Sequence, residues 1–159
     1  MSVNKFKTLR HIETVRNYLN SCIKELLHRQ EQHDQSKLQS PEAEIFEIYT
    51  PKLRGLTYGS PEYQEQMKEM DVAIKHHTFI NRHHPEYHAD GILGMNLVDL
   101  LELICDWKAA TLRHDNGDVS ESLDMNQKRF GYTDELKTIL NNTIKWLNEQ
   151  EVYHKANES

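Results

Sequence analysis

The chain has 159 residues, which predicts one compact domain over residues 1–159, because single domains commonly hold about 100–200 residues. Its 19 Lys and Arg against 25 Asp and Glu give a net charge of −6. We therefore expect no nucleic-acid-binding groove, since such a groove needs a basic face. The mean hydropathy of −0.79 and the lack of a long apolar run exclude a membrane-spanning helix.

Cysteine usage and the first residues bear on the compartment. Cys22 and Cys105 are the two cysteines and are widely separated, a usage that suits free thiols in a reducing cytoplasm. Residues 1–10 contain no apolar segment of the kind that a signal peptide requires. We therefore expect a cytoplasmic protein.

Helical periodicity runs through the whole sequence, and no alternating segment predicts a strand. The expected fold class is therefore all-α, with about six helices in a single compact domain. Apolar residues at steps of three and four predict a long amphipathic first helix. They are Phe6, Leu9, Ile12, Val15, Leu19, Ile23 and Leu26.

Two further helices follow a short irregular stretch that begins at residue 33. Pro41 and Glu42 begin a helix that continues to about Leu53, because proline is tolerated at the first helical position. Residues 60–62 (Ser-Pro-Glu) are a second start signal, for a helix that reaches the histidine-rich segment 76–84. We expect that helix to end at or shortly before Pro85.

The remaining residues predict three more helices. Asn96 is the expected cap of a helix over 97–112, and Gly117 follows it. A weaker helix covers 120–129. Thr133 is the expected cap of the last helix, and residues 150–159 are expected to be a frayed tail. The apolar inner face of the last helix carries Leu136, Leu140, Ile144 and Leu147.

The first candidate site is the dipeptide His33-Asp34. Imidazole and carboxylate both bind ions such as Zn, Mn, Fe or Mg, and adjacent residues grip one ion if the backbone bends. Lys37, three residues after Asp34, projects from about the same side in a helical segment, as a cation for a bound phosphate. The alternative interpretation is a capping Asp beside a surface His.

Histidine is unusually frequent, with ten residues in the chain and five of them between positions 76 and 88. On a continuous helix, His77, Asn81 and His84 form one stripe, and His76 and His83 form a neighbouring one. A solvated helix end, where His favours the helix dipole, explains one or two of these histidines but not four. We therefore expect a metal or catalytic role for at least one.

Three acids share one face of the expected helix over 97–112. Asp99, Glu102 and Asp106 stand at i, i+3 and i+7 among mostly apolar residues, and a buried helix carries such carboxylates only when cations compensate them. For Asp99 we expect a solvated position. For Asp106, beside Trp107, we expect a metal ligand.

The order of these residues, H…HD…H…H…D from His11 to Asp106, resembles the HD-domain superfamily of metal-dependent phosphohydrolases. The version with two extra histidines resembles its binuclear branch, which includes the HD-GYP cyclic dinucleotide phosphodiesterases. Ser36 stands where that branch has the glycine of HD-x-G-K, and no GYP segment follows, so cyclic dinucleotide cleavage is not predicted. The pattern HDxSK…HxxxNxHHPE…ELxxDW is also similar to that of a small family of uncharacterised phage and bacterial proteins.

The resemblance implies an all-helical fold that holds one or two divalent ions (Mn, Fe, Zn or Mg), bridged by the carboxylate of Asp34. It implies that His33 and Asp106 hold the first ion together with His11. The second ion is then held by His77 and His84. His76 and His83 remain alternatives to these last two ligands.

Charge and hydrogen bonding predict further roles around the ions. Lys37 would contact a phosphate oxygen. The catalytic candidates are Asp34, Lys37 and Glu102. Asn81 and Glu102 would orient the imidazoles, because ligating histidines usually donate their other N–H to such partners. Arg82 and Arg113 are candidates for binding the leaving group or a second phosphate.

The role of His11 depends on the continuity of the first helix. An unbroken helix carries the chain about 27 Å from His11 to Arg29, and four extended residues return at most about 14 Å. His11 is then too far from His33 to share an ion with it. A break near residues 20–21 would bring it back, and without a break His11 is not a ligand.

Three functions follow, from different classes. The first is a phosphohydrolase that acts on a nucleotide or another small phosphoester through a metal-activated water. The second is a mixed-valent diiron oxygenase, since the inositol oxygenase type uses the same ligand order. The third is a non-enzymatic, metal-stapled interaction module of phage origin, which would act in the host cytoplasm.

Overall fold

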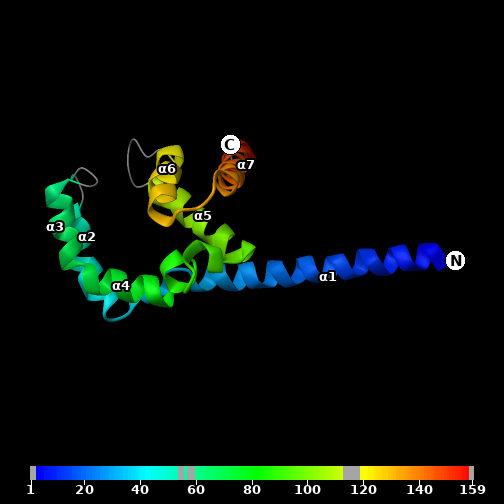
Figure 1. Ribbon diagram of the computed structural model, residues 1–159, viewed down its shortest axis with the longest axis horizontal. Coiled ribbons are helices and arrows are strands. Elements are labelled where there is room, and N and C mark those ends of the chain that lie inside the picture. The colour runs from blue at the N-terminus through cyan, green and yellow to red at the C-terminus, as the bar shows by residue number, and fades with distance from the viewer. Residues whose placement is uncertain (1–2, 54–55, 57–59, 113–118, 158–159) are drawn as a thin grey trace. The chain divides into compact units, whose positions relative to one another are not determined.

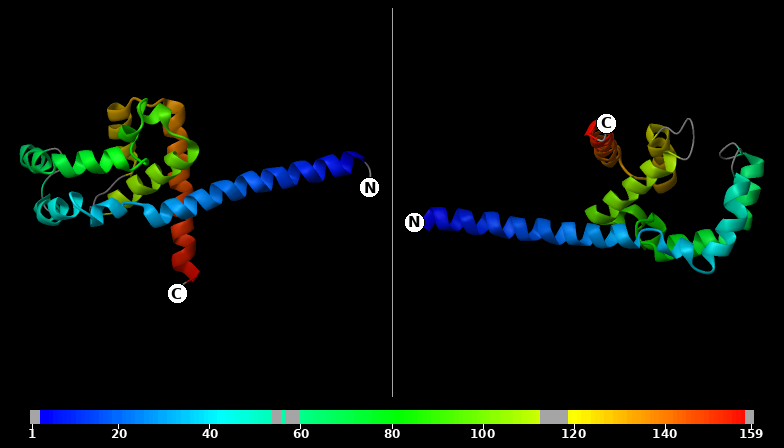
Figure 2. Two further views of the ribbon diagram at one scale, coloured as in Figure 1. Left: turned by 90° about the horizontal axis from the view of Figure 1, so that it is seen from below. Right: turned by 180° about the vertical axis from the view of Figure 1, so that it is seen from behind.

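The computed structural model describes residues 3–53, 56, 60–112 and 119–157. These residues form seven α-helices and three short 3-10 helices, with no strand among them, which confirms the all-α class. The chain divides into two compact units, Met1–Gln35 and Ser36–Ser159. Figures 1 and 2 follow the helices in chain order by colour.

The first unit is dominated by α1 (Val3–Gln32), a continuous helix of 30 residues. The break that we considered near residues 20–21 is absent. Several apolar positions of the expected inner face are exposed, such as Phe6 at 61% and Leu19 at 57%. After α1 the chain turns at residues 33–34 into a short 3-10 helix, η1 (Gln35–Leu38).

Three helices open the second unit, and they begin where local chemistry predicts. They are α2 (Glu42–Leu53), α3 (Pro61–Glu69) and α4 (Asp71–Ile80). Ser60 caps α3, because its Oγ accepts a hydrogen bond from the backbone N–H of Tyr63 at 3.1 Å. The helix expected over this region is divided at Met70, which is buried. Helix α2 packs against both α3 and α4 (Figure 1).

The histidine-rich segment is not one continuous helix, which is a correction. Helix α4 ends at Ile80, and Asn81 has extended backbone angles of φ −101° and ψ 111°. The chain then turns, and His84 N–H donates to the Asn81 carbonyl at 3.1 Å. Two short 3-10 helices follow, η2 (Pro85–Tyr87) and η3 (Gly91–Gly94). The turn, and not a helical stripe, therefore decides where His83 and His84 point.

The core of the second unit lies among α5 (Leu97–Thr111), α6 (Val119–Phe130) and α7 (Asp134–Asn157). The expected face of the last helix is confirmed by the burial of Leu140 and Ile144. Gly131 ends α6 in the left-handed region at φ 66°, and its N–H donates to the Gln127 carbonyl at 2.8 Å. This is the conformation for which glycine is favoured after a helix.

Two predictions fall outside the described residues, those for Arg113 and Gly117. Among the described residues, no helix combines the length and the apolar character that crossing a membrane would need.

Candidate metal centre

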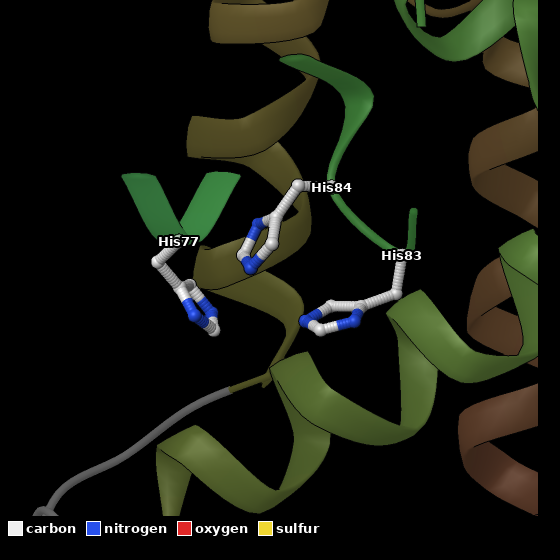
Figure 3. Close-up of side chains that lie close together, drawn as sticks. All are labelled: His77, His83 and His84. Carbon is white, nitrogen blue, oxygen red and sulfur yellow. The ribbon is translucent and has the colours of Figure 1, made fainter. Parts of the chain in front are cut away.

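Three histidine rings converge in the second unit. One ring nitrogen from each of His77, His83 and His84 lies within 4.8 Å of the others. The ring centroids are 5.8 Å apart for His77 and His83, 4.7 Å for His77 and His84, and 4.2 Å for His83 and His84. Figure 3 shows the three rings turned toward a common centre. We call this set the histidine cluster, and it can hold a metal ion.

Carboxylates select which nitrogen of two rings faces the cluster. His77 Nδ1 lies 2.9 Å from Glu42 Oε2, and His83 Nδ1 lies 3.2 Å from Glu102 Oε1. An ionised carboxylate only accepts hydrogen bonds, so each of these contacts favours the tautomer that carries its proton on Nδ1. The Nε2 atoms of both rings, which are buried, then carry the lone pairs that a metal ion needs.

Helix packing explains the position of His77. It lies on the inner face of α4, one turn after the fully buried Ala73. Glu42 and Phe46 stand four residues apart on α2 and therefore share a face. Glu42 bonds to the imidazole, and the Phe46 ring meets it edge-on at 6.3 Å. The packing of α2 on α4 thus fixes the ring from two sides.

The structure brings together three of the predicted ligands and alternatives. We predicted His77 and His84, with His83 as an alternative to His84, and all three rings join the cluster. We treated His83 and His84 as alternatives because we assumed a continuous helix, and the structure places both rings in the cluster. His76 lies outside the cluster, with a side chain 38% exposed and its Nδ1 2.7 Å from Glu42 Oε1.

His33 and Asp34 belong to the first unit. Asp34 has φ 58°, a left-handed conformation that Asp tolerates better than most residues. This is the bent backbone that a chelating pair requires, and His33 Nε2 lies 3.7 Å from Asp34 Oδ2. Asp106 lies half-buried on α5, one turn after Glu102. Its joint role with His33 and Asp34 stays a prediction.

The prediction that His11 shares an ion with His33 is wrong. Helix α1 is unbroken, so His11 and Gln32 are separated by about 31 Å along the helix axis. This is the condition under which we excluded His11 as a ligand.

Asp99 is not solvated, so the solvated position that we expected for it is wrong. It is fully buried at the start of α5, where it completes a capping box with Asn96. Both of its oxygens accept from Arg82, at 2.8 Å from Nε and 2.9 Å from Nη2. Arg82, which we named as a candidate for substrate binding, therefore holds a structural carboxylate.

Lys37 and Asn81 contact residues that themselves contact the histidine cluster or belong to it. Lys37 Nζ is 6.0 Å from the centre of the Phe46 ring that contacts His77. Asn81 donates through Nδ2 to Ser36 Oγ at 2.8 Å and to the His77 carbonyl at 2.9 Å. The roles that we expect for the two residues stay predictions.

Sequence reasoning missed Glu42. It stands 34 and 35 residues before the two histidines that it contacts, so no local periodicity joins them. Glutamate in the first turn of a helix is also common, because it favours the helix dipole.

The chain belongs to a family of unknown function, DUF5662, which matches residues 2–151. Neither the comparison with curated proteins nor the comparison with solved structures found a match.

Proposed function

We propose that this protein is a metal-dependent phosphohydrolase, in which the histidine cluster holds a divalent ion and a small phosphoester is the substrate. The observation that carries the proposal is the convergence of three histidines whose Nε2 atoms are buried, two of which have Nδ1 within 3.2 Å of a carboxylate. A carboxylate on the far nitrogen is the usual partner of a metal-bound imidazole.

The donor set narrows the choice of ion. Imidazole nitrogen suits Zn and Fe, whereas Mg prefers oxygen ligands. Three neutral histidines leave the double positive charge of the ion uncancelled and a fourth position open, as in catalytic zinc sites. When bound, such an ion supplies a water whose pKa is lowered toward neutrality. Among the ions that we considered, zinc and iron therefore fit best.

The residues of the chain supply the remaining steps. His77, His83 and His84 hold the ion, and the burial of the Nε2 atoms keeps bulk water from competing for it. Lys37 is the proposed cation for a non-bridging phosphate oxygen, where charge builds up during attack at phosphorus. The HD-like dipeptide His33-Asp34 stays the candidate for the other ion of the binuclear site, as the resemblance to the HD-domain superfamily implies.

The first test measures metal and activity together. Purified protein is reconstituted with Zn, Fe or Mn, its bound metal is quantified, and hydrolysis of nucleotides and simple phosphomonoesters is assayed. His84→Ala is the test variant, because His84 is less buried than His77 and His83. His11→Ala is the matched control, on the exposed surface of α1.

We expect at least one equivalent of metal in the wild type, lost together with activity by at least about 100-fold in His84→Ala. His11→Ala should retain both. Wild-type protein that binds no metal after reconstitution would contradict the proposal. Bound iron with consumption of dioxygen and no hydrolysis would replace it by the oxygenase.

A further inference from the structure

Glu42 is a buried carboxylate between two imidazoles. It is the first residue of α2 and is 0% exposed. Its Oε1 lies 2.7 Å from His76 Nδ1, and its Oε2 lies 2.9 Å from His77 Nδ1. Ser36 Oγ donates to Oε2 at 3.0 Å. Each oxygen therefore has its own ring, and the carboxylate is held in one orientation.

The helix alone does not require a glutamate at this place. An acid in the first turn favours the helix dipole from an exposed position too, as Glu44 illustrates in the same turn. Burying the charge is costly unless hydrogen bonds satisfy it. A buried glutamate whose oxygens are directed at histidines thus points to a role that involves the rings.

The two histidines differ in where their other nitrogen lies. The Nε2 atom of His77 is buried, and its ring belongs to the histidine cluster. His76 keeps a side chain that is 38% exposed. The same carboxylate therefore joins a cluster ring on one side to a surface ring on the other.

We propose that Glu42 is a positioning residue for the metal centre: it holds the His77 proton on Nδ1 and so presents the Nε2 lone pair to the ion. This inference rests on the proposed function, because it assigns a role to the ion that the function requires. Without the carboxylate, the imidazole can place its proton on Nε2. That tautomer cannot bind a metal through the atom that faces the cluster.

Ser36 and Asn81 belong to the same hydrogen-bond network as Glu42 and His77. The Asn81 amide donates to Ser36 Oγ, and Ser36 in turn donates to Glu42. Two acceptors therefore lie within reach of the His77 N–H, Glu42 Oε2 at 2.9 Å and Ser36 Oγ at 3.1 Å from Nδ1, and the Asn81 Nδ2 atom lies 3.0 Å from the same nitrogen. The carboxylate is the stronger acceptor of the two, because it is charged. His76, on the other oxygen, keeps the carboxylate in place and is not itself a ligand in this proposal.

The experiment compares Glu42→Gln and Glu42→Asp with Glu44→Gln, a control with the same change in the same helical turn. Zinc affinity is measured in the full-length protein by competition with a chelator. The tautomer of His77 is read from its ring ¹⁵N shifts in the metal-free protein. Circular dichroism and thermal unfolding show that each variant is folded.

We expect Glu42→Gln to weaken zinc binding by about 10–100-fold and to shift His77 away from the Nδ1–H tautomer. Glu42→Asp keeps a carboxylate and should restore part of the affinity, whereas Glu44→Gln should match the wild type. A folded Glu42→Gln that binds zinc as the wild type does, with an unchanged His77 tautomer, would overturn the proposal.

The two proposals fail in different ways. If the wild type binds no zinc, the proposed function is overturned and the role of Glu42 toward a metal falls with it. If the wild type binds zinc and the Glu42 variants bind it equally well, the metal centre stands and only the positioning role is overturned.

Discussion

Tyr132 fixes the junction between α6 and α7. Its side chain is buried, and its hydroxyl donates to the Leu123 carbonyl at 2.7 Å. Burial is the main cause that raises the pKa of Tyr132 to about 12, and the nearby charge of Asp124 adds to it. The folded protein therefore keeps the phenol protonated at a pH at which an unfolded tyrosine has lost its proton.

This pKa shift predicts a loss of stability in alkali. The contribution of Tyr132 is fully present below its ordinary pKa of 10.0 and is lost as the pH rises from there toward about 12. Tyr132→Phe should remove that part of the pH dependence and should lower the free energy of unfolding near neutral pH by about 1 kcal/mol, because a buried hydrogen bond is lost.

Urea unfolding across this pH range checks the prediction. Tyr18→Phe, at an exposed position on α1, is the control and should leave both the stability and its pH dependence unchanged. A Tyr132→Phe protein with the same alkaline profile as the wild type would contradict the assignment.

At the scale of single residues, sequence reasoning reached the cluster but not its full membership. The density of histidines between 76 and 88 was enough to predict a metal role, because a polar helix end does not explain so many imidazoles. Which histidines join the cluster depends on the turn after Ile80, and helical periodicity does not predict that turn. Glu42 depends on the contact between α2 and α4, which no spacing in the sequence encodes.

At the scale of helices, the sequence predicted where helices begin better than where a helix is interrupted. Caps act within a few residues, so Ser60 and Asn96 identified the first turns of α3 and α5 directly. The break at Met70 was missed because the apolar period continues through it. Met70 is the buried residue between α3 and α4, and α2 packs against both helices.

The start of α5 combines a cap with a charge pair. Asp99 accepts from the backbone N–H of Asn96 at 3.0 Å and from the guanidinium of Arg82. Asp99→Ala removes both interactions and should lower the free energy of unfolding by about 2–4 kcal/mol. The control is Asp90→Ala, since Asp90 precedes η3 without a side-chain capping bond, and its effect should stay within about 0.5 kcal/mol. Urea denaturation of both variants measures the difference, and equal stabilities would refute it.

At the scale of the molecule, charge favours cation binding by the second unit. Residues 36–159 hold 13 Lys and Arg against 21 Asp and Glu, a net charge of −8, and a negative field raises the local concentration of cations. The whole histidine cluster lies in this unit. Metal binding should therefore stabilise the second unit directly.

Metal-linked stability is the corresponding prediction. A ligand that binds only the folded state at 100 times its dissociation constant adds about 2.7 kcal/mol to the free energy of unfolding. Zinc should therefore raise the unfolding temperature of the wild type, and a chelator should reverse the rise. Calorimetric scans measure it, and His84→Ala provides the comparison. A rise of the same size in His84→Ala would mean that zinc binds elsewhere.

The short distance along the chain between the ligands has a further consequence. His77 and His84 are seven residues apart, and closing so short a loop costs little chain entropy. The unfolded chain can therefore gather the same imidazoles around an ion, and binding to the unfolded state offsets stabilisation of the folded one. As zinc is raised, the unfolding temperature should stop rising once the denatured segment begins to bind it. The zinc dependence of the unfolding temperature would then depend on the entropy of the denatured chain as well as on the packing of the folded protein.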